Sequence, residues 1–196
     1  MSENTTLTTK DIIEVVNEHS QVDRQWYWKR SDFWHWGFAG RPERIPAVCE
    51  LAAQYYNGDI VEIGCADGIT TEGLAKVAQR HGRKVIAIDP WQREPKDYER
   101  FMERMISYGD VLDVLRMKSQ DLGVIRYLKA HKLCFVFIDG EHTYQALKSD
   151  IQAVYHAAII ACDEILWDWP MLRAFHEAAG DRQKVRHPYC NEAYIV

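Results

Sequence analysis

The sequence predicts an α/β fold in which a doubly wound, mostly parallel sheet carries helices on both faces. Three observations lead to this prediction. Between residues 59 and 179, short apolar segments alternate with stretches of helical periodicity. The central residues of segments 84–89 and 133–139 are apolar without alternation, as strands covered on both faces require. Repeated strand–helix units imply right-handed crossovers, so the expected architecture is Rossmann-like.

Each predicted element follows from a local pattern. Thr8 to Asp11 has the spacing of a capping box, which opens a first helix, and Asn57-Gly58 closes a later one. Apolar residues at helical spacing predict helices at about 9–18, 45–56, 69–81, 95–107, 121–130, 143–158 and 170–179. Short apolar runs predict strands at 59–63, 84–89, 111–117, 133–139 and 164–168. Residues 184–187 and 193–196 are expected to form a terminal hairpin on the sheet edge.

The composition indicates a globular protein and disfavours several classes. Of the 196 residues, 47% are hydrophobic and 27% are charged, which is enough for a core. A net charge of −5 disfavours long nucleic-acid partners. The sequence has no apolar run that could span a bilayer and no secretory signal, so we expect a cytoplasmic protein without a membrane partner. Five cysteines without paired spacing predict neither disulfides nor zinc, and Cys65, Cys134 and Cys162 are expected in the core.

The turn after the first predicted strand has the features of a ligand site. Gly64 permits a tight turn there, and Gly68 lets the following helix N-terminus approach a ligand. Asp89 ends the second predicted strand, where its carboxylate can accept hydrogen bonds from two ribose hydroxyls. Trp91 follows and can lie against an aromatic base. Together these residues predict a pocket for an adenosine-containing cofactor.

The spacing around this turn favours one cofactor over another. A dinucleotide fingerprint is G-x-G-x-x-G, but here Glu62 precedes Gly64 and the middle glycine is missing. A carboxylate at this position repels a pyrophosphate and suits a cationic amino acid. S-adenosylmethionine carries an ammonium and a sulfonium and has no phosphate. The residues therefore favour S-adenosylmethionine over a nicotinamide or flavin dinucleotide.

Four motifs resemble a known family. The stretches VEIGCADGITTEGLA, VIAIDPW, FVFIDGEHTYQALKSDI and ILWDW resemble class I S-adenosylmethionine-dependent methyltransferases. The Asp-Gly-x-His-x-Tyr run is the most specific of them. It resembles the group that includes macrolide-sugar O-methyltransferases and the cephalosporin-pathway hydroxylase/methyltransferase protein, which is methyltransferase family 24. The resemblance covers about residues 45–170.

The resemblance implies roles for single residues. The cofactor site would comprise Glu62, Gly64, Gly68, Thr70, Asp89, Trp91, Ser119 and Gln120. Asp139 would be a ligand of a divalent metal, His142 the nearby base, and Asp168 a second metal ligand. Where the family commonly has an acid before Asp168, this chain has Trp167. Cys162-Asp163 replaces the usual glycine pair.

Such a constellation suits methyl transfer to a hydroxyl. If Asp139 and Asp168 end adjacent strands, their carboxylates offer the hard oxygen ligands that Mg²⁺ prefers. The metal would orient two oxygens and lower the pKa of a hydroxyl, and His142 would take its proton. Simpler interpretations remain open: Asp139 as a helix cap, and His142 as an ordinary first-turn residue. Lys148 and Asp150 are assigned to a solvated helix face.

The expected function is O-methylation of a small-molecule hydroxyl, on a sugar or natural-product scaffold. One alternative is a nicotinamide-dependent oxidoreductase on the same fold. Another is a non-catalytic binding or assembly module. A third, an RNA-base methyltransferase, is disfavoured by the acidic charge balance.

Residues 1–44 are expected to form a helical, Trp-rich segment attached to a methyltransferase domain of residues 45–196. Four of the seven Trp residues fall between residues 26 and 36. They could pack a flap onto the sheet edge, close as a lid over the acceptor pocket, or form a homo-oligomer contact. As a lid, the segment would bring His35, Arg41 and Arg44 toward a polar acceptor or the cofactor carboxylate.

Overall fold

The computed structural model describes residues 7–27, 41–166, 168–186 and 192–196. Its helices are α1 (Thr9–Tyr27), α2 (Arg41–Tyr55), α3 (Ile69–His81), α4 (Pro95–Met105), the 3₁₀ helix η2 (Ile106–Tyr108), α5 (Leu122–Ala130), α6 (Tyr144–Ala153) and α7 (Trp169–Ala179). Its strands are β1 (Asp59–Ile63), β2 (Val85–Ile88), β3 (Leu112–Leu115), β4 (Leu133–Ile138), β5 (Ile159–Cys162), β6 (Lys184–Arg186) and β7 (Ala193–Ile195). The predictions for His35 and Trp167 lie outside the described residues.

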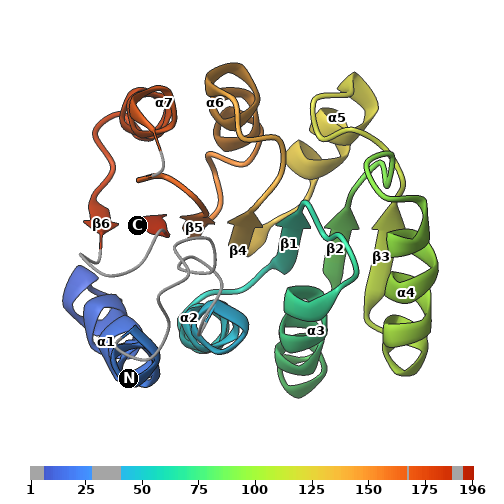
Figure 1. Ribbon diagram of the computed structural model, residues 1–196, viewed down its shortest axis with the longest axis horizontal. Coiled ribbons are helices and arrows are strands. Elements are labelled where there is room, and N and C mark those ends of the chain that lie inside the picture. Colours follow the sequence, from blue (N-terminus) through green and yellow to red (C-terminus); the bar gives the residue numbers. More distant parts are fainter. Residues whose placement is uncertain (1–6, 28–40, 167, 187–191) are drawn as a thin grey trace.

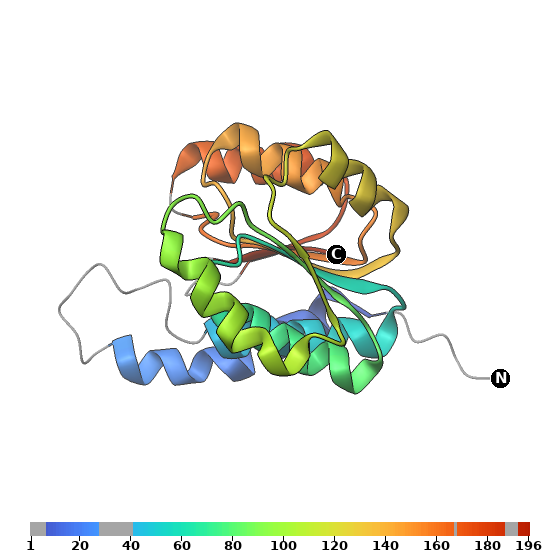
Figure 2. The same cartoon turned by 90° about the vertical axis from the view of Figure 1, so that its right-hand side faces the viewer.

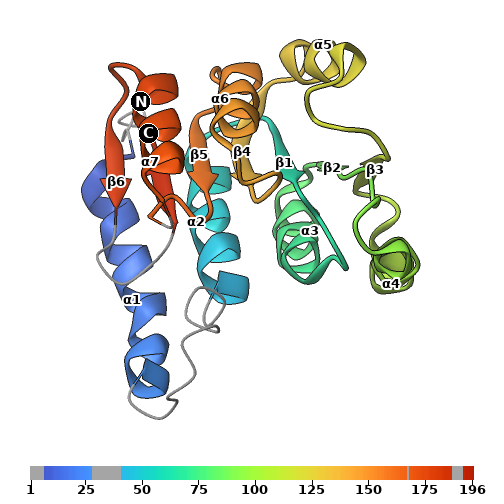
Figure 3. The ribbon, with the colours of Figure 1, turned by 45° about the horizontal axis from the view of Figure 1, so that its top comes forward.

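The strands form one sheet in the order β3-β2-β1-β4-β5-β7-β6. β1 to β5 pair in parallel, and β7 pairs antiparallel with both β5 and β6. Helices α1 to α4 cover one face and α5 to α7 the other (Figures 1 and 2). The predicted doubly wound α/β architecture is confirmed, and so is the terminal hairpin, whose outer strand β6 forms the sheet edge near α1 (Figure 3).

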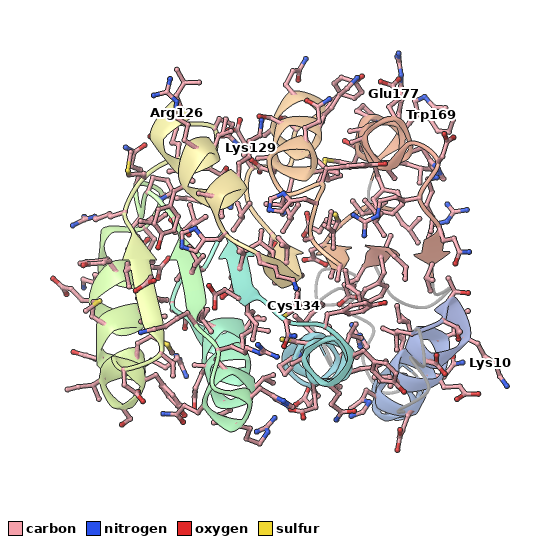
Figure 4. All side chains as sticks on the ribbon, turned by 180° about the vertical axis from the view of Figure 1, so that it is seen from behind. Lys10, Arg126, Lys129, Cys134, Trp169 and Glu177 are labelled. Atoms are coloured by element: carbon pink, nitrogen blue, oxygen red, sulfur yellow. The ribbon has the colours of Figure 1, made fainter. Side chains whose placement is uncertain are left out.

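Side-chain alternation along the strands builds two cores. On β1, Val61 and Ile63 pack with the α5–α7 layer, whereas Ile60 packs with the α1–α3 layer. All residues of β4 are buried, which explains the absence of alternation in its sequence. Cys65, Cys134 and Cys162 are buried thiols as predicted, and Cys134 lies in the sheet layer (Figure 4).

The fifth strand was placed wrongly by the sequence prediction. The structure forms β5 from Ile159–Cys162, which lies between the predicted helix 143–158 and the predicted strand 164–168 and had been assigned to neither, and α6 ends at Ala153. Residues 164–166 and 168 belong to no strand. A short apolar run such as Ile-Ile-Ala-Cys has no periodicity that separates a buried strand from a helix, so its pairing with β4 decides its structure.

The N-terminal helix is longer than predicted. α1 continues to Tyr27 because no glycine or proline interrupts residues 9–27. Ile12 and Val16 on this helix are fully buried against the core under the sheet, so the beginning of α1 is part of the main body. None of the described helices is long and apolar enough to cross a bilayer.

Candidate functional site

A cavity of about 740 Å³ lies where the parallel strands end. Its walls come from the segments that follow β1, β2, β3, β4 and β5, so it runs across the carboxyl edge of the parallel sheet. This is the edge at which doubly wound sheets bind ligands, and the volume suits a small molecule. Seven predicted site residues line the cavity: Gly64, Asp89, Trp91, Ser119, Gln120, Asp139 and His142.

Asp89 organises one wall of the cavity. Its Oδ1 accepts a hydrogen bond from the backbone N–H of Trp91 at 2.6 Å, and its Oδ2 accepts one from the N–H of Ala66 at 3.0 Å. Both donors have left-handed backbone angles, with φ of 45° at Ala66 and 47° at Trp91. Such strain in residues other than glycine persists only where the surroundings hold it, and it is common at ligand sites. Each Asp89 oxygen keeps a lone pair that a ribose hydroxyl can use.

Gly64 brings β1 and β4 together at the cavity. Its φ is +89°, and a Cβ there would lie 2.0 Å from the carbonyl oxygen of Asp139. The backbone N–H of Asp139 donates to the carbonyl oxygen of Ile63 at 2.8 Å, so pairing continues past the end of β4. Glycine is therefore required for the close approach that places Asp139 beside the turn.

Three predicted cofactor residues do not line the cavity. Glu62 alternates with Ile63 and faces the α3 side, where its carboxylate accepts a hydrogen bond from the hydroxyl of Thr71. It is 1% exposed. Gly68 has φ +85°, and the position of its missing Cβ is filled by Phe101 of α4, so this glycine serves helix packing. Thr70 is buried in the first turn of α3. Strand alternation explains the placement of Glu62, because a strand directs the side chains of neighbouring residues to opposite faces.

Trp91 lies in the cavity wall but is 4% exposed. Its ring centroid is 5.0 Å from that of Tyr98 and 4.9 Å from that of Phe101. Its Nε1 donates a hydrogen bond to the carbonyl oxygen of Ala66 at 2.7 Å. The ring therefore anchors the turn after β1 to α4 and offers little open surface for stacking on a base.

His142 lies between two carboxylates. Its Nε2 is 3.2 Å from Oδ1 of Asp139, and its Nδ1 is 2.7 Å from Oε2 of Glu164. The hydrogen bond to Asp139 and the negative charge of Glu164 raise the pKa of the imidazole, and partial burial opposes them. Glu164 was missed because its segment was predicted as a strand. With β5 at its observed place, Glu164 lies two residues past the strand end, at the same edge of the sheet as Asp139.

The raised pKa of His142 gives a direct prediction. In a titration of the histidine ring protons by NMR, His142 is expected to titrate above the ordinary value of 6.5. Asp139→Asn should lower this pKa most and Glu164→Gln less, since the Asp139 hydrogen bond is the larger cause. His176 is an internal control, because burial and the charge of Arg186 lower its pKa and neither substitution touches it. An unchanged His142 pKa in both variants would contradict the observed geometry.

The predicted metal pair is not formed. Asp168 follows no strand and instead caps α7, where its Oδ1 accepts the backbone N–H of Met171 at 2.8 Å. Within the described residues there is no cluster of three or more His, Cys, Asp or Glu arranged to hold a metal ion. The expectation that Asp139 and Asp168 share Mg²⁺ is therefore not supported.

Two more predicted placements are corrected. Asp150 was assigned to a solvated helix face, but it is buried and points toward Gln120 at the cavity. The lid alternative would have brought Arg44 to a ligand, but Arg44 is buried and its Nη2 donates to Oε1 of Glu192 at 2.8 Å. Lys148, by contrast, is bound to Glu177 on the outer side of α7, which Figure 4 shows together with Trp169.

The part of the chain that forms most of the cavity matches a known protein family. A family model described as a methyltransferase domain matches residues 61–162, just over half of the chain. That range includes most of β1, all of β2 to β5 and the seven predicted residues that line the cavity, while Glu164 lies two residues beyond it. No curated protein matches the chain.

Several solved structures share the fold. CalS11, described as a TDP-rhamnose 3'-O-methyltransferase of calicheamicin biosynthesis, is 15% identical with a TM-score of 0.63, covering 100% of this chain and 95% of that one. TomG from Streptomyces achromogenes, an O-methyltransferase of tomaymycin synthesis solved with SAM, is 15% identical with a TM-score of 0.60, covering 100% and 99%. The SAH-bound methyltransferase PaMTH1 of Podospora anserina is 12% identical with a TM-score of 0.57, covering 100% and 98%.

Proposed function

The chain belongs to the methyltransferase domain family, and on this premise we propose that it transfers the methyl group of S-adenosylmethionine to a hydroxyl of a small molecule. The observation that carries the choice of cofactor is the charge of the cavity. Six carboxylates line it against two cationic side chains, Arg93 and Lys118, and one imidazole. The six acids are Asp89, Glu94, Asp97, Asp139, Glu141 and Glu164.

This charge balance separates the candidate cofactors. Carboxylates around a partly closed cavity attract the ammonium and sulfonium of S-adenosylmethionine and repel the pyrophosphate of a dinucleotide. From the sequence, the preference for S-adenosylmethionine rested on Glu62, which does not face the cavity. The other carboxylates now support it, and they disfavour the nicotinamide-dependent alternative.

The residues present fit the two ends of the cofactor. Asp89 after β2 suits the ribose hydroxyls, and Ser119 and Gln120 after β3 offer polar groups for the base. His142 and its two carboxylates follow β4 and β5, farther along the same edge. The nucleoside end would therefore lie over β2 and β3, and the methyl group would point toward His142.

When bound, the cofactor supplies an electrophilic methyl group on a sulfonium. The acceptor oxygen forms a bond to the methyl carbon as the carbon–sulfur bond breaks, and the hydroxyl proton must leave. Nε2 and Nδ1 of His142 both face carboxylates, so the neutral imidazole can take that proton only with one ring nitrogen turned from its carboxylate toward the acceptor. Asp139 and Glu164 then stabilise the resulting imidazolium. Proton transfer of this kind contributes typically about 10²–10⁴-fold in rate, and alignment in the cavity adds to it.

The acceptor is proposed to be a hydroxyl of a sugar or natural-product scaffold. CalS11 and TomG, which share the fold, have names that refer to such chemistry. No step is assigned to a metal ion. A cytoplasmic location and a homo-oligomeric assembly remain predictions from the sequence.

Thermal unfolding with and without ligand tests the cofactor class. S-adenosylhomocysteine at 100 times its Kd should stabilise the protein by about 2.7 kcal/mol, whereas NADH at the same concentration should leave the Tm unchanged. Stabilisation by NADH with no response to S-adenosylhomocysteine would reject the proposal. A panel of sugar and natural-product hydroxyls with radiolabelled S-adenosylmethionine then tests transfer. Binding without transfer to any acceptor would favour the non-catalytic alternative.

A further inference from the structure

A buried carboxylate on α6 contacts the polar residues at the base end of the cavity. Asp150 is 1% exposed, and its Oδ1 accepts a hydrogen bond from Nε2 of Gln120 at 2.9 Å. Oγ of Ser119 accepts a hydrogen bond from the same Gln120 nitrogen at 2.8 Å, which places the Ser119 hydroxyl beside this carboxylate. Ser119 and Gln120 line the cavity, but Asp150 does not, so it can act on a ligand only through them.

The charge state of Asp150 decides how the Gln120 amide is turned. Burial raises the pKa of Asp150 to about 6, while the hydrogen bonds from Ser119 and Gln120 lower it and the charge of Glu141 raises it. At pH 8 the group is therefore ionised and can only accept hydrogen bonds. Gln120 must then present its NH₂ group to Asp150, because its carbonyl oxygen would be repelled.

The second amide hydrogen of Gln120 is used as well. Nε2 of Gln120 donates to Oγ of Ser119 at 2.8 Å in addition to Asp150. Both donors of the amide are thus engaged. Its carbonyl Oε1 accepts no hydrogen bond from the described residues, and Gln120 lines the cavity. The group of Gln120 that a ligand can contact is therefore its carbonyl oxygen, a hydrogen-bond acceptor whose direction is fixed.

We propose that Asp150 is a positioning residue that fixes the Gln120 amide with its oxygen toward the cavity, so that the site selects a base carrying an exocyclic amino group. Adenine has that amino group as a donor. Hypoxanthine has a carbonyl oxygen at the same position, which would face the oxygen of Gln120. This inference rests on the proposed function, because it assumes that the base of the cofactor lies beside Gln120.

Isothermal titration calorimetry at pH 8 with S-adenosylhomocysteine and S-inosylhomocysteine tests the proposal. The wild-type protein should bind the adenine compound at least about tenfold more tightly, as sites built around a hydrogen bond reject the analogue that lacks it. Asp150→Leu frees the amide to rotate and should reduce the ratio of the two Kd values to about twofold or less. A purely structural role would weaken both ligands equally and leave the ratio unchanged.

Four further variants extend the test. Asp150→Asn can present either an oxygen or an NH₂ group to Gln120, so its ratio should fall to about threefold, and it replaces Asp150→Leu if that variant does not fold. Gln120→Met should lose the preference, and combining it with Asp150→Leu should cause no further loss, because both act through one amide. Gln152→Leu, at an exposed position of α6, should keep the wild-type ratio.

The outcomes separate this inference from the proposed function. Tight binding of S-adenosylhomocysteine with an unchanged ratio in the Asp150 variants would overturn the role of Asp150 and leave the methyltransferase proposal standing. A wild-type protein that binds the two compounds equally tightly would also overturn the role of Asp150 and leave the methyltransferase proposal standing. A wild-type protein that binds neither compound would overturn both.

Discussion

Replacing Asp89 with alanine is expected to weaken the binding of S-adenosylhomocysteine by about 10²-fold or more. Each Asp89 oxygen would accept one ribose hydroxyl, and a hydrogen bond to a charged group contributes about 1.5–3 kcal/mol. The same oxygens hold the N–H groups of Ala66 and Trp91, so the substitution also releases the strained turn that shapes the wall. Calorimetric titration of the purified variant measures the loss.

A matched control distinguishes this contact from the general charge of the cavity. Asp97 also lines the cavity, but it pairs with Arg100 on α4 at 3.1 Å. Asp97→Ala removes the same charge and should change the Kd less than about threefold. Equal losses in the two variants would show that only net charge matters and would contradict the assigned role of Asp89. The Tm of each free variant shows whether the fold is retained.

Replacing Arg44 with methionine is expected to lower the free energy of unfolding by about 3–5 kcal/mol. Arg44 is 2% exposed and Glu192 is fully buried, and their side chains join α2 to the start of β7 at 2.8 Å. Removing one partner leaves a charge inside the protein, which costs far more than the pair itself contributes. Urea unfolding followed by circular dichroism measures the change.

The chain offers two controls for this prediction. Arg80 contacts Glu50 at 2.6 Å but is 56% exposed, so Arg80→Met should cost less than about 1 kcal/mol. The double variant Arg44→Met with Glu192→Leu removes both charges and should recover most of the stability lost by Arg44→Met alone. If the single variant were as stable as the wild type, the pair would not hold α2 to β7.

Local patterns predicted most of the fold. β1 and α3 occur at the predicted residues, because an apolar strand, glycines at both ends of the helix and helical periodicity agree there. The carboxyl-edge location of Asp89, Asp139 and His142 followed from the rule for parallel sheets. These features depend on residues close together in the sequence.

The errors arose where the outcome depends on distant residues. Ile159–Cys162 is a strand because it pairs with β4, and this shift brought Glu164 to His142 and moved Asp168 to a helix cap. Asp150 was assigned to solvent although it lies against Gln120, thirty residues away in the sequence. Neither contact leaves a local signal.

The sequence by itself determined the α/β class, the order of most elements and the edge of the sheet at which the cavity lies, because periodicity and turn residues act over a few positions. Only the tertiary structure decided which acids face the cavity. Glu62 turns toward α3, Glu164 lines the cavity beside His142, and Asp150 lies behind the cavity wall and contacts it through Gln120. Side-chain direction depends on strand register and on the neighbours across the sheet, and these are fixed only when the layers come together.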